Sequence, residues 1–268
     1  MTDALGHELR HVFRAVPLVA AHASELAAPG DFVTVDAAGV PVLLVRDKAG
    51  ELRAHVNVCR HRGTRLVSEA RGHDRRAFVC PLHGWAYDLE GALFHLPRAE
   101  GFDHVDASKL GLPSVPFAPA FGLVWIALAR GAVVDPRALV GADLARELDA
   151  LDLGSRVAWQ PTSSVKGVDW KRAVDAILDA CGRADAARLD GCGPNLRFEL
   201  GSATLFLLFP NAVLFVDDAH ASVFTVTPTG AAACRVSTFA LVSAASPGLA
   251  AAADVARLRA AVEERLAR

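Results

Sequence analysis

The hydrophobic positions of this 268-residue chain change their spacing along its length. Residues 1–29 carry apolar side chains at rough helical spacing before the break at Ala28-Pro29-Gly30. Residues 30–128 consist of short apolar runs separated by turn signals such as Lys48-Ala49-Gly50. The pattern predicts an N-terminal helical segment followed by a small β-rich domain. Its predicted strands are 32–35, 40–45, 54–58 and 77–79.

The remaining residues, 129–268, have a different pattern. Residues 131–154 are rich in Ala, Leu and Asp and are predicted to be helical, and a helix is predicted to begin near Asp169. Further predicted elements are strands at 157–165, 203–209, 212–216, 221–226 and 234–242 and a terminal helix at 250–266. This order favours a second domain with an antiparallel sheet, so the predicted fold class is α+β.

Composition excludes several classes of partner. The 28 basic and 30 acidic residues give a net charge of −2, and no Lys/Arg-rich run is present, so neither nucleic acid nor a membrane surface is indicated. No apolar stretch is long enough to span a membrane, and Asp3, His7 and Glu8 lie where a signal peptide would be apolar. We therefore expect a cytoplasmic protein. The five cysteines favour metal ligation over a disulfide framework.

Four of the candidate ligands fall in a regular motif. Cys59-Arg60-His61 is followed, after 18 intervening residues, by Cys80-Pro81-Leu82-His83. Each short segment offers one thiolate and one imidazole. In a Rieske-type [2Fe-2S] cluster two Cys bind one iron and two His bind the other. The motif therefore predicts such a cluster, bound by Cys59, His61, Cys80 and His83.

A structural zinc site is the main alternative, because it can use the same four ligand types. Zinc sites of this composition usually pair Cys with Cys and His with His in sequence, whereas here the two types are interleaved. Trp85 and Tyr87 are predicted to be packing residues. Arg60 and Arg62 could contact an acidic electron donor or could simply be solvated.

Both segments resemble the cluster loops of Rieske non-haem iron oxygenase terminal components. The flanking sequences Pro29-Gly30-Asp31 and Phe121-Gly122-Leu123-Val124-Trp125 fit the same family. The loop spacing is slightly longer than usual, and we assign the excess to a polar hairpin tip at residues 71–76. The resemblance implies electron transfer from a reductase or ferredoxin and a three- or six-membered ring of subunits.

The resemblance also implies a second metal site, which this sequence lacks in its usual form. Val168-Asp169-Trp170-Lys171 resembles the start of the family's iron-site helix, but the positions of the two histidine ligands hold Gly182 and Ala187. We therefore expect mononuclear Fe(II) to be absent. The chain ends soon after Val242, which leaves only Asp254 and Glu264 as carboxylate candidates. A relocated site at Asp217, Asp218 and His220 is an alternative to a plain polar turn.

One acidic residue of the family motif is retained. Asp179 resembles the residue that bridges the iron site to a cluster histidine of the adjacent subunit. Lys171, Asp175, Asp179 and Gly182 share one helical face, which alternatively forms only a Lys171–Asp175 ion pair facing solvent. Cys181, Cys192 and Cys234 are predicted to be buried apolar residues.

The resulting hypothesis is an electron-transfer subunit of a ring-hydroxylating or demethylating oxygenase, which relays electrons from a reductase to a catalytic partner subunit. Whether such a chain is an enzyme by itself is left open. Two alternatives are a stand-alone oxygenase with atypical iron ligands and an assembly subunit whose cluster mainly supports the fold.

Overall fold

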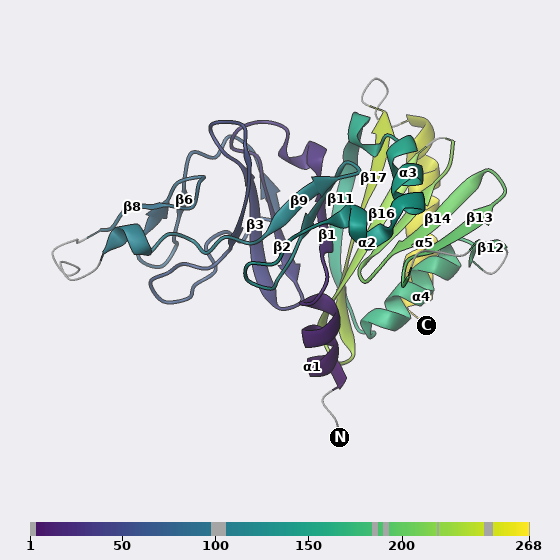
Figure 1. Cartoon of the computed structure of the whole chain (residues 1–268), viewed down its shortest axis with the longest axis horizontal. Coiled ribbons are helices and arrows are strands. Elements are labelled where there is room, and N and C mark those ends of the chain that lie inside the picture. The colour runs from purple at the N-terminus through teal and green to yellow at the C-terminus, as the bar shows by residue number, and fades with distance from the viewer. Residues whose placement is uncertain are drawn as a thin grey trace.

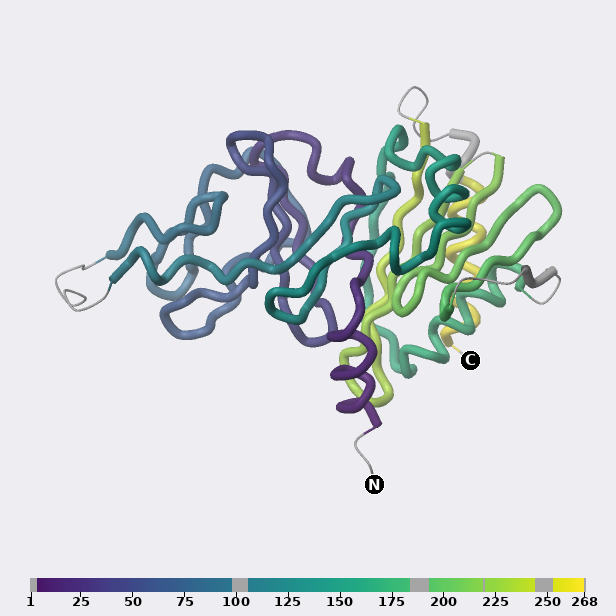
Figure 2. Tube along the Cα trace, viewed as in Figure 1, coloured from purple at the N-terminus to yellow at the C-terminus, as the bar shows by residue number. Residues whose placement is uncertain are grey.

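The computed structural model describes residues 4–97, 106–183, 187–189, 193–218, 220–243 and 249–267. They form two lobes side by side, a β-rich first lobe and a second lobe in which helices cover a large sheet (Figure 1). The chain starts at the junction, builds the first lobe and returns to the junction before it builds the second (Figure 2). The predicted α+β class is confirmed. No described helix is both long enough and apolar enough to cross a membrane.

The described part of the first lobe is built from small antiparallel sheets with the strand orders β4-β3-β2-β5, β6-β7-β8 and β1-β10-β9. The strands are β1 (Leu18–His22), β2 (Phe32–Ala37), β3 (Val40–Arg46), β4 (Leu52–Val56), β5 (Arg71–Gly72), β6 (Phe78–Val79), β7 (Ala86–Tyr87), β8 (Leu93–His95), β9 (Phe117–Ala120) and β10 (Leu123–Ile126). Short helical segments accompany them: α1 (Ala4–Glu8), η1 (Leu9–Phe13), η2 (Ala23–Leu26) and η4 (Ala107–Lys109).

The second lobe is built on an antiparallel sheet with the order β11-β17-β16-β15-β14-β13-β12. Its strands are β11 (Arg156–Lys166), β12 (Ala187–Leu189), β13 (Leu196–Leu200), β14 (Ala203–Leu208), β15 (Ala212–Val216), β16 (Ala221–Gly230) and β17 (Ala233–Ser243). Its helices are α2 (Pro136–Val140), α3 (Ala142–Ala150), η5 (Leu153–Ser155), α4 (Trp170–Ala180) and α5 (Leu249–Leu266). Helix α4 packs on β15, β16 and β17 and against α5.

Most predicted elements form close to their expected bounds, including the helix near Asp169. The Asp169 side chain accepts hydrogen bonds from the backbone N–H groups of Lys171 and Arg172, which caps α4 at its N-terminus. The apolar residues of α4, among them Ala173 and Ile177, face the sheet. Local capping and helical spacing together explain why this prediction is confirmed.

Two predictions were wrong. Residues 18–22 were expected to be helical but form β1, because they pair with β10 in the register Leu18↔Ile126. Residues 71–76 were expected to be a polar hairpin tip, but Arg71 and Gly72 form β5, which pairs with β2, and the next strand β6 lies in another sheet. His73 Nδ1 lies 2.7 Å from Asp31 Oδ1. In both places a partner distant in sequence decides the conformation. The domain bounds 1–29, 30–128 and 129–268 stay a prediction.

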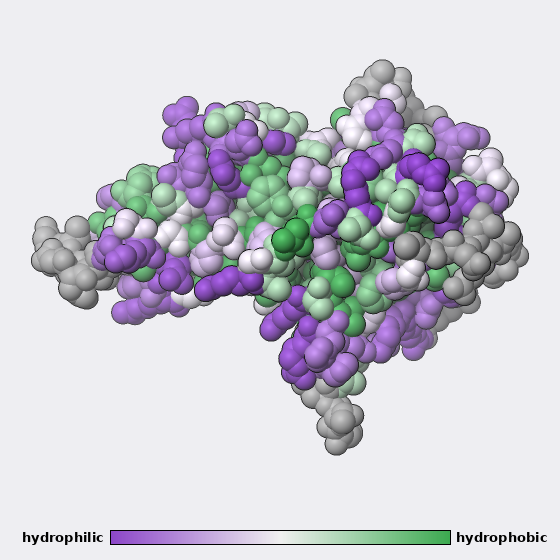
Figure 3. Space-filling model, viewed as in Figure 1, coloured by the Kyte–Doolittle hydropathy of each residue, from purple (hydrophilic) through white to green (hydrophobic). Residues whose placement is uncertain are grey.

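Buried polar contacts join the lobes at β1. The Asn211 side chain receives a hydrogen bond from the Val19 N–H at 3.0 Å and donates one to the Val19 carbonyl at 2.9 Å. Asn211 is buried, so both backbone groups of Val19 depend on this amide. Hydrophobic residues also gather at the surface where the lobes meet, in the middle of the view in Figure 3.

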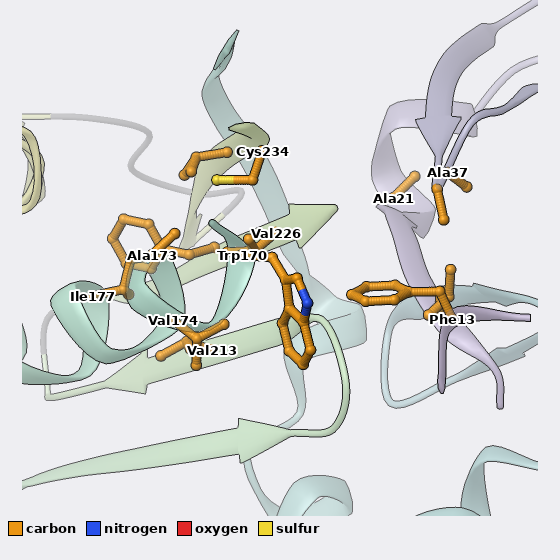
Figure 4. Packing of buried hydrophobic residues seen from close by; sticks show 14 of the residues in the cluster. Phe13, Ala21, Ala37, Trp170, Ala173, Val174, Ile177, Val213, Val226 and Cys234 are labelled. Carbon is orange, nitrogen blue, oxygen red and sulfur yellow. The ribbon is translucent and has the colours of Figure 1, made fainter. Parts of the chain in front are cut away.

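One hydrophobic cluster runs through this junction. The Phe13 and Trp170 rings meet edge to face with centroids 4.9 Å apart, so the N-terminal segment packs against the start of α4 (Figure 4). The Trp170 indole donates a hydrogen bond to Glu8 Oε2 at 2.7 Å. The same cluster includes Ala21 and Ala37 from the first lobe and Val226 from β16. The described lobes therefore share a core.

The turn between β9 and β10 brings the backbones of two segments close together. Phe121 and Gly122 have φ of 55° and 72°, as expected for a two-residue hairpin turn. A Cβ on Gly122 would lie 2.6 Å from the Gly154 nitrogen and 2.8 Å from the Leu153 carbonyl carbon. Only glycine fits here without a backbone shift.

We predict that Gly122→Ala destabilises the protein more than Gly50→Ala. Gly50 also has positive φ, 83°, but a Cβ there meets nothing within 4 Å. Gly50→Ala should therefore show only the conformational cost of about 1–2 kcal/mol, whereas Gly122→Ala should lose roughly 1–3 kcal/mol more through overpacking. Thermal unfolding of the two variants side by side measures the difference. Equal melting temperatures would contradict the close approach.

Candidate metal centre

The four predicted cluster ligands converge at one end of the first lobe. Cys59 and Cys80 are buried, and the rings of His61 and His83 meet edge to face with centroids 4.5 Å apart. His61 also stacks on Trp85, with centroids 4.8 Å apart and planes within 7°. His83 is exposed and His61 is half-buried. The two thiols therefore lie inward and the two imidazoles lie outward. The fold brings the two motifs together although 18 residues separate them in sequence.

The two loops that carry these ligands share a backbone plan. The Cys59 N–H donates to the Thr64 carbonyl at 2.8 Å, and the Gly63 N–H donates to the Cys59 carbonyl at 3.0 Å. The second loop repeats these bonds at the same offsets and lengths, from Cys80 to Trp85 and from Gly84 to Cys80. Gly63 and Gly84 have φ of 74° and 75°, a region that favours glycine. Each cysteine is therefore held by its own closed turn.

Tyr87 has a polar role that the sequence did not reveal. Its hydroxyl accepts a hydrogen bond from the Arg60 N–H at 3.0 Å and lies 3.4 Å from Cys59 Sγ. Because the oxygen already accepts from Arg60, its own proton can be donated to the sulfur. Burial, followed by the bond to Cys59, raises the pKa of Tyr87, so the hydroxyl stays protonated. The prediction that Tyr87 only packs was incomplete.

The electrostatics of the site suit ligation. Partial burial, with the neighbouring His83 and Arg62, lowers the pKa of His61 and so favours the neutral imidazole that binds metal. Burial raises the pKa of the Cys59 thiol, against the effect of the Tyr87 hydrogen bond. A bound cation would offset this burial cost, because thiolates bind metal only when deprotonated. Two inward thiols and two outward imidazoles fit a cluster with one Cys-bound and one His-bound iron.

The Asn57 side chain stabilises the first loop through two hydrogen bonds to the backbone of Val67. Its side chain donates to the Val67 carbonyl at 2.8 Å and accepts from the Val67 N–H at 2.9 Å. Asn57 is fully buried, so both bonds are shielded from water. The sequence gave no signal for this role of Asn57, since its partner Val67 lies ten residues away.

The end of α4 is the place where the family's iron histidines would lie. Gly182 has φ of 92°, and a Cβ there would lie 2.7 Å from Leu200 Cδ2. Ala187 opens β12 and pairs with Glu199 on β13. A larger side chain at position 182 would thus need both an unfavourable backbone conformation and a shift of Leu200.

Asp179 is engaged within the chain. Arg183 Nε donates to Asp179 Oδ1 at 2.8 Å, and Arg183 Nη1 donates to Asp175 Oδ1 at 2.7 Å. The Lys171–Asp175 pair, which was the alternative for this helical face, does not form, because Lys171 binds Glu8 and Arg183 binds Asp175 instead. Arg183, which was not among the predicted residues of this face, lies beyond the end of the helix and contacts both acidic side chains.

The other candidate residues are distributed as follows. Cys181 and Cys234 are buried, as predicted, and burial raises their thiol pKa values to about 12 and about 11. Cys192 lies outside the described residues. His220 is buried beside Asp217, whereas Asp218 is exposed. Among the described residues, no three His, Cys, Asp or Glu side chains are arranged to hold a single metal ion.

Comparison with known proteins agrees with this geometry. Residues 16–116 match the model of the Rieske [2Fe-2S] domain. The carnitine monooxygenase oxygenase subunit of Escherichia coli (strain K12) is 34% identical over 189 residues, which cover 68% of this chain and 49% of that protein. The glycine betaine monooxygenase oxygenase subunit of Pseudomonas aeruginosa is 30% identical over 170 residues, covering 63% and 38%. The chain thus spans half or less of the length of these curated relatives.

Solved structures extend the likeness across both lobes. The apo form of the quaternary ammonium Rieske monooxygenase CntA has a TM-score of 0.85 at 20% identity, covering 97% of this chain and 78% of that one. Naphthalene 1,2-dioxygenase from Rhodococcus sp. has a TM-score of 0.77 at 20% identity, covering 97% and 79%. These likenesses establish the fold of the second lobe. Residues 16–116 therefore belong to the Rieske [2Fe-2S] domain family, and the chain as a whole has the fold of Rieske oxygenases.

Proposed function

We propose that this chain is a Rieske [2Fe-2S] electron-transfer subunit of a multicomponent oxygenase. It takes electrons from a reductase or ferredoxin and passes them to the mononuclear iron of a catalytic partner subunit. Cys59, His61, Cys80 and His83 hold the cluster, which supplies one-electron transfer. The exposed ring of His83 lies at the surface through which an electron would leave.

The observation that carries this proposal is the structure around the end of α4. Gly182 occupies a backbone conformation that disfavours any side chain, and Leu200 fills the adjacent space. The Arg183 guanidinium binds the carboxylates of Asp175 and Asp179, where a metal site would need those charges for a cation. These contacts support a lobe that keeps the family's fold without the usual iron site.

Asp179 bears on the direction of electron flow. As a bridging acid it would serve the subunit that receives electrons, whereas this chain is proposed to donate them. A bridging role for Asp179 stays a prediction, and it would require the carboxylate to leave Arg183. In the proposed assembly, a ring of three or six subunits, His83 or His61 faces the bridging acid of the catalytic partner.

The stand-alone oxygenase is the second candidate, since the curated relatives are named as oxygenase subunits. Iron content separates the two proposals. A cluster alone gives two irons per chain, whereas a cluster with a mononuclear site gives three. Three irons per chain, with oxygen-dependent turnover by the isolated protein, would favour the second candidate.

Electron relay is tested with a partner that cannot use its own cluster. The partner is an oxygenase subunit that is encoded by a neighbouring gene and has intact iron histidines. One cysteine ligand of the partner's own cluster is replaced by Ser, so the partner cannot pass electrons through that cluster. We expect this chain to form a mixed ring with it and to restore reductase-dependent turnover. The matched control is His83→Ala in this chain, which should restore nothing. A reducible cluster that never restores turnover would contradict the proposal.

The cluster ligands lead to a spectroscopic prediction. The anaerobically purified protein should be red-brown and, when reduced, should give the low-average-g EPR signal of a mixed Cys/His [2Fe-2S] centre. His61→Ala and His83→Ala should each abolish or grossly change this signal, whereas His73→Ala should leave it unchanged, because His73 binds Asp31 instead. A colourless protein that contains zinc would contradict the ligand assignment.

Tyr87→Phe should lower the midpoint potential of the cluster. The tyrosine hydroxyl lies 3.4 Å from Cys59 Sγ, and a hydrogen bond to a thiolate favours the reduced, more negative state. Loss of one such bond corresponds to roughly 20–60 mV for a one-electron couple. Redox titration followed by EPR measures the shift, and Phe94→Leu on exposed β8 provides a control that should leave the potential unchanged. An unchanged potential in Tyr87→Phe would show that the hydroxyl does not donate to Cys59.

A further inference from the structure

A cavity of about 300 Å³ lies between the two lobes, and its described lining includes none of the four cluster ligands. Strand β2 and residues of the segment 65–71 line it from the first lobe, and strands β11, β16 and β17 line it from the second (Figure 1). At about 30 Å³ per water molecule, this is more space than a phosphate ion fills, and it is typical of a site for a small organic molecule.

The second lobe contributes a row of hydroxyl groups to this cavity. Ser163, Ser237 and Thr225 are register partners on the neighbouring strands β11, β17 and β16, and all three line the cavity. Side chains alternate between the two faces of a sheet, and the adjacent Val226 and Val236 belong to the hydrophobic cluster that includes residues of α4. The sheet face turned toward the first lobe is therefore polar at this place, and its hydroxyls can donate hydrogen bonds to a ligand.

Guanidinium groups from both lobes line the same cavity. Arg65 and Arg71 come from the first lobe, and Arg235 comes from β17. Asp36 pairs with Arg65 and with Arg235, whose Nη2 lies 3.5 Å from Asp36 Oδ2. Glu25 Oε1 lies 3.2 Å from Arg71 Nη2, and burial raises the pKa of Glu25, so this carboxyl is protonated more readily than an exposed one. Three guanidiniums thus stand against two carboxylates in the described wall, which favours an anion.

Arg235 can donate further hydrogen bonds, because a guanidinium offers five N–H donors. Its terminal nitrogens lie 3.5 Å from Asp36 Oδ2 and 3.5 Å from Ser163 Oγ, which are long contacts. Its Nε is buried and has no hydrogen-bond partner among the described residues. An anion in the cavity that accepted from Arg235 would therefore satisfy a buried donor without breaking a short ion pair.

The placement of the donors favours a phosphate over a carboxylate. Arg71 belongs to one wall of the cavity, whereas Arg235 and Thr225 belong to the opposite wall. A phosphate group presents three strong acceptor oxygens and carries up to two negative charges, whereas a carboxylate presents two oxygens and one charge. The phosphate can therefore accept hydrogen bonds from both walls at once, and guanidiniums match its geometry.

We propose that this cavity binds a small organic phosphate. Its phosphate oxygens accept hydrogen bonds from Arg235 and Thr225 on one wall and from Arg71 on the other, and its carbon portion occupies the rest of the space. The ligand bridges the two lobes and contacts none of the cluster ligands. The site goes beyond the electron-relay role, and its failure would leave that role intact.

Isothermal titration calorimetry of the full-length, cluster-loaded protein with glycerol 3-phosphate, in Tris buffer, tests the proposal. We expect saturable binding, and Arg235→Gln should weaken it about tenfold, the usual effect of removing one charged hydrogen bond. The matched control is Arg197→Gln. Arg197 lies on β13 of the same sheet and pairs with Glu147 and Glu199, but it does not line the cavity, so its loss should leave binding unchanged.

Two further measurements separate the parts of the proposal. Thr225→Val keeps the β-branched shape, and with its fold checked by an unchanged visible spectrum of the cluster it should weaken glycerol 3-phosphate binding about fivefold. Glycerol, which lacks the phosphate, and inorganic phosphate, which lacks the carbon portion, should each bind about tenfold more weakly or less. The proposal is overturned if glycerol 3-phosphate does not bind, if glycerol or inorganic phosphate binds as tightly, if Thr225→Val binds as the unchanged protein does, or if Arg235→Gln and Arg197→Gln behave alike.

Discussion

The cluster site depends on two short loops that must keep two thiols and two imidazoles together in a small volume. Each loop closes on itself through the same two backbone hydrogen bonds, around Cys59 and Gly63 in one case and Cys80 and Gly84 in the other. These bonds fix the cysteines locally, before any long-range contact is considered. The core behind them, with Trp85 and Tyr87, then sets the distance between the loops. Rigid loops of this kind suit electron transfer, because little has to move when charge changes.

The second lobe keeps its fold for a reason that does not involve metal. Its sheet supplies Asn211, which satisfies both backbone groups of Val19, and α4 supplies Trp170, which packs against Phe13. Removing the lobe would therefore expose apolar surface and leave buried polar groups of the first lobe unpaired. This structural role is independent of the chemistry at the end of α4, because Trp170 lies at the start of that helix.

Predictions from sequence succeeded where the determining interactions are local. The α4 boundary follows from the Asp169 cap, and the strands of the large sheet follow from apolar runs between turns. The Rieske domain was predictable because its metal site demands particular residue types at short spacing, and the four ligands themselves stay a prediction. Predictions failed where a partner distant in sequence decides the conformation of a segment. Residues 18–22 become a strand only because β10 lies beside them, and His73 turns toward Asp31, 42 residues away. Arg183 lies four residues after Asp179, the spacing of a helical ion pair, so that contact had a signal in the sequence. The contact of Arg183 with Asp175, eight residues away, had none.

The charges at the end of α4 are balanced within the chain, because Arg183 pairs with both Asp175 and Asp179. The Asp175 and Asp179 carboxylates lie on one helical face and would repel one another without a nearby positive charge. Arg183 resolves the problem because one planar guanidinium reaches Asp175 and Asp179 together. Gly182, directly before it, takes the left-handed conformation that turns the chain back toward the helix. The backbone bend that leaves no room for a larger side chain at position 182 is thus the same bend that delivers the compensating charge. A histidine placed at position 182 alone would therefore not create an iron site, since Arg183 would still hold the Asp179 carboxylate.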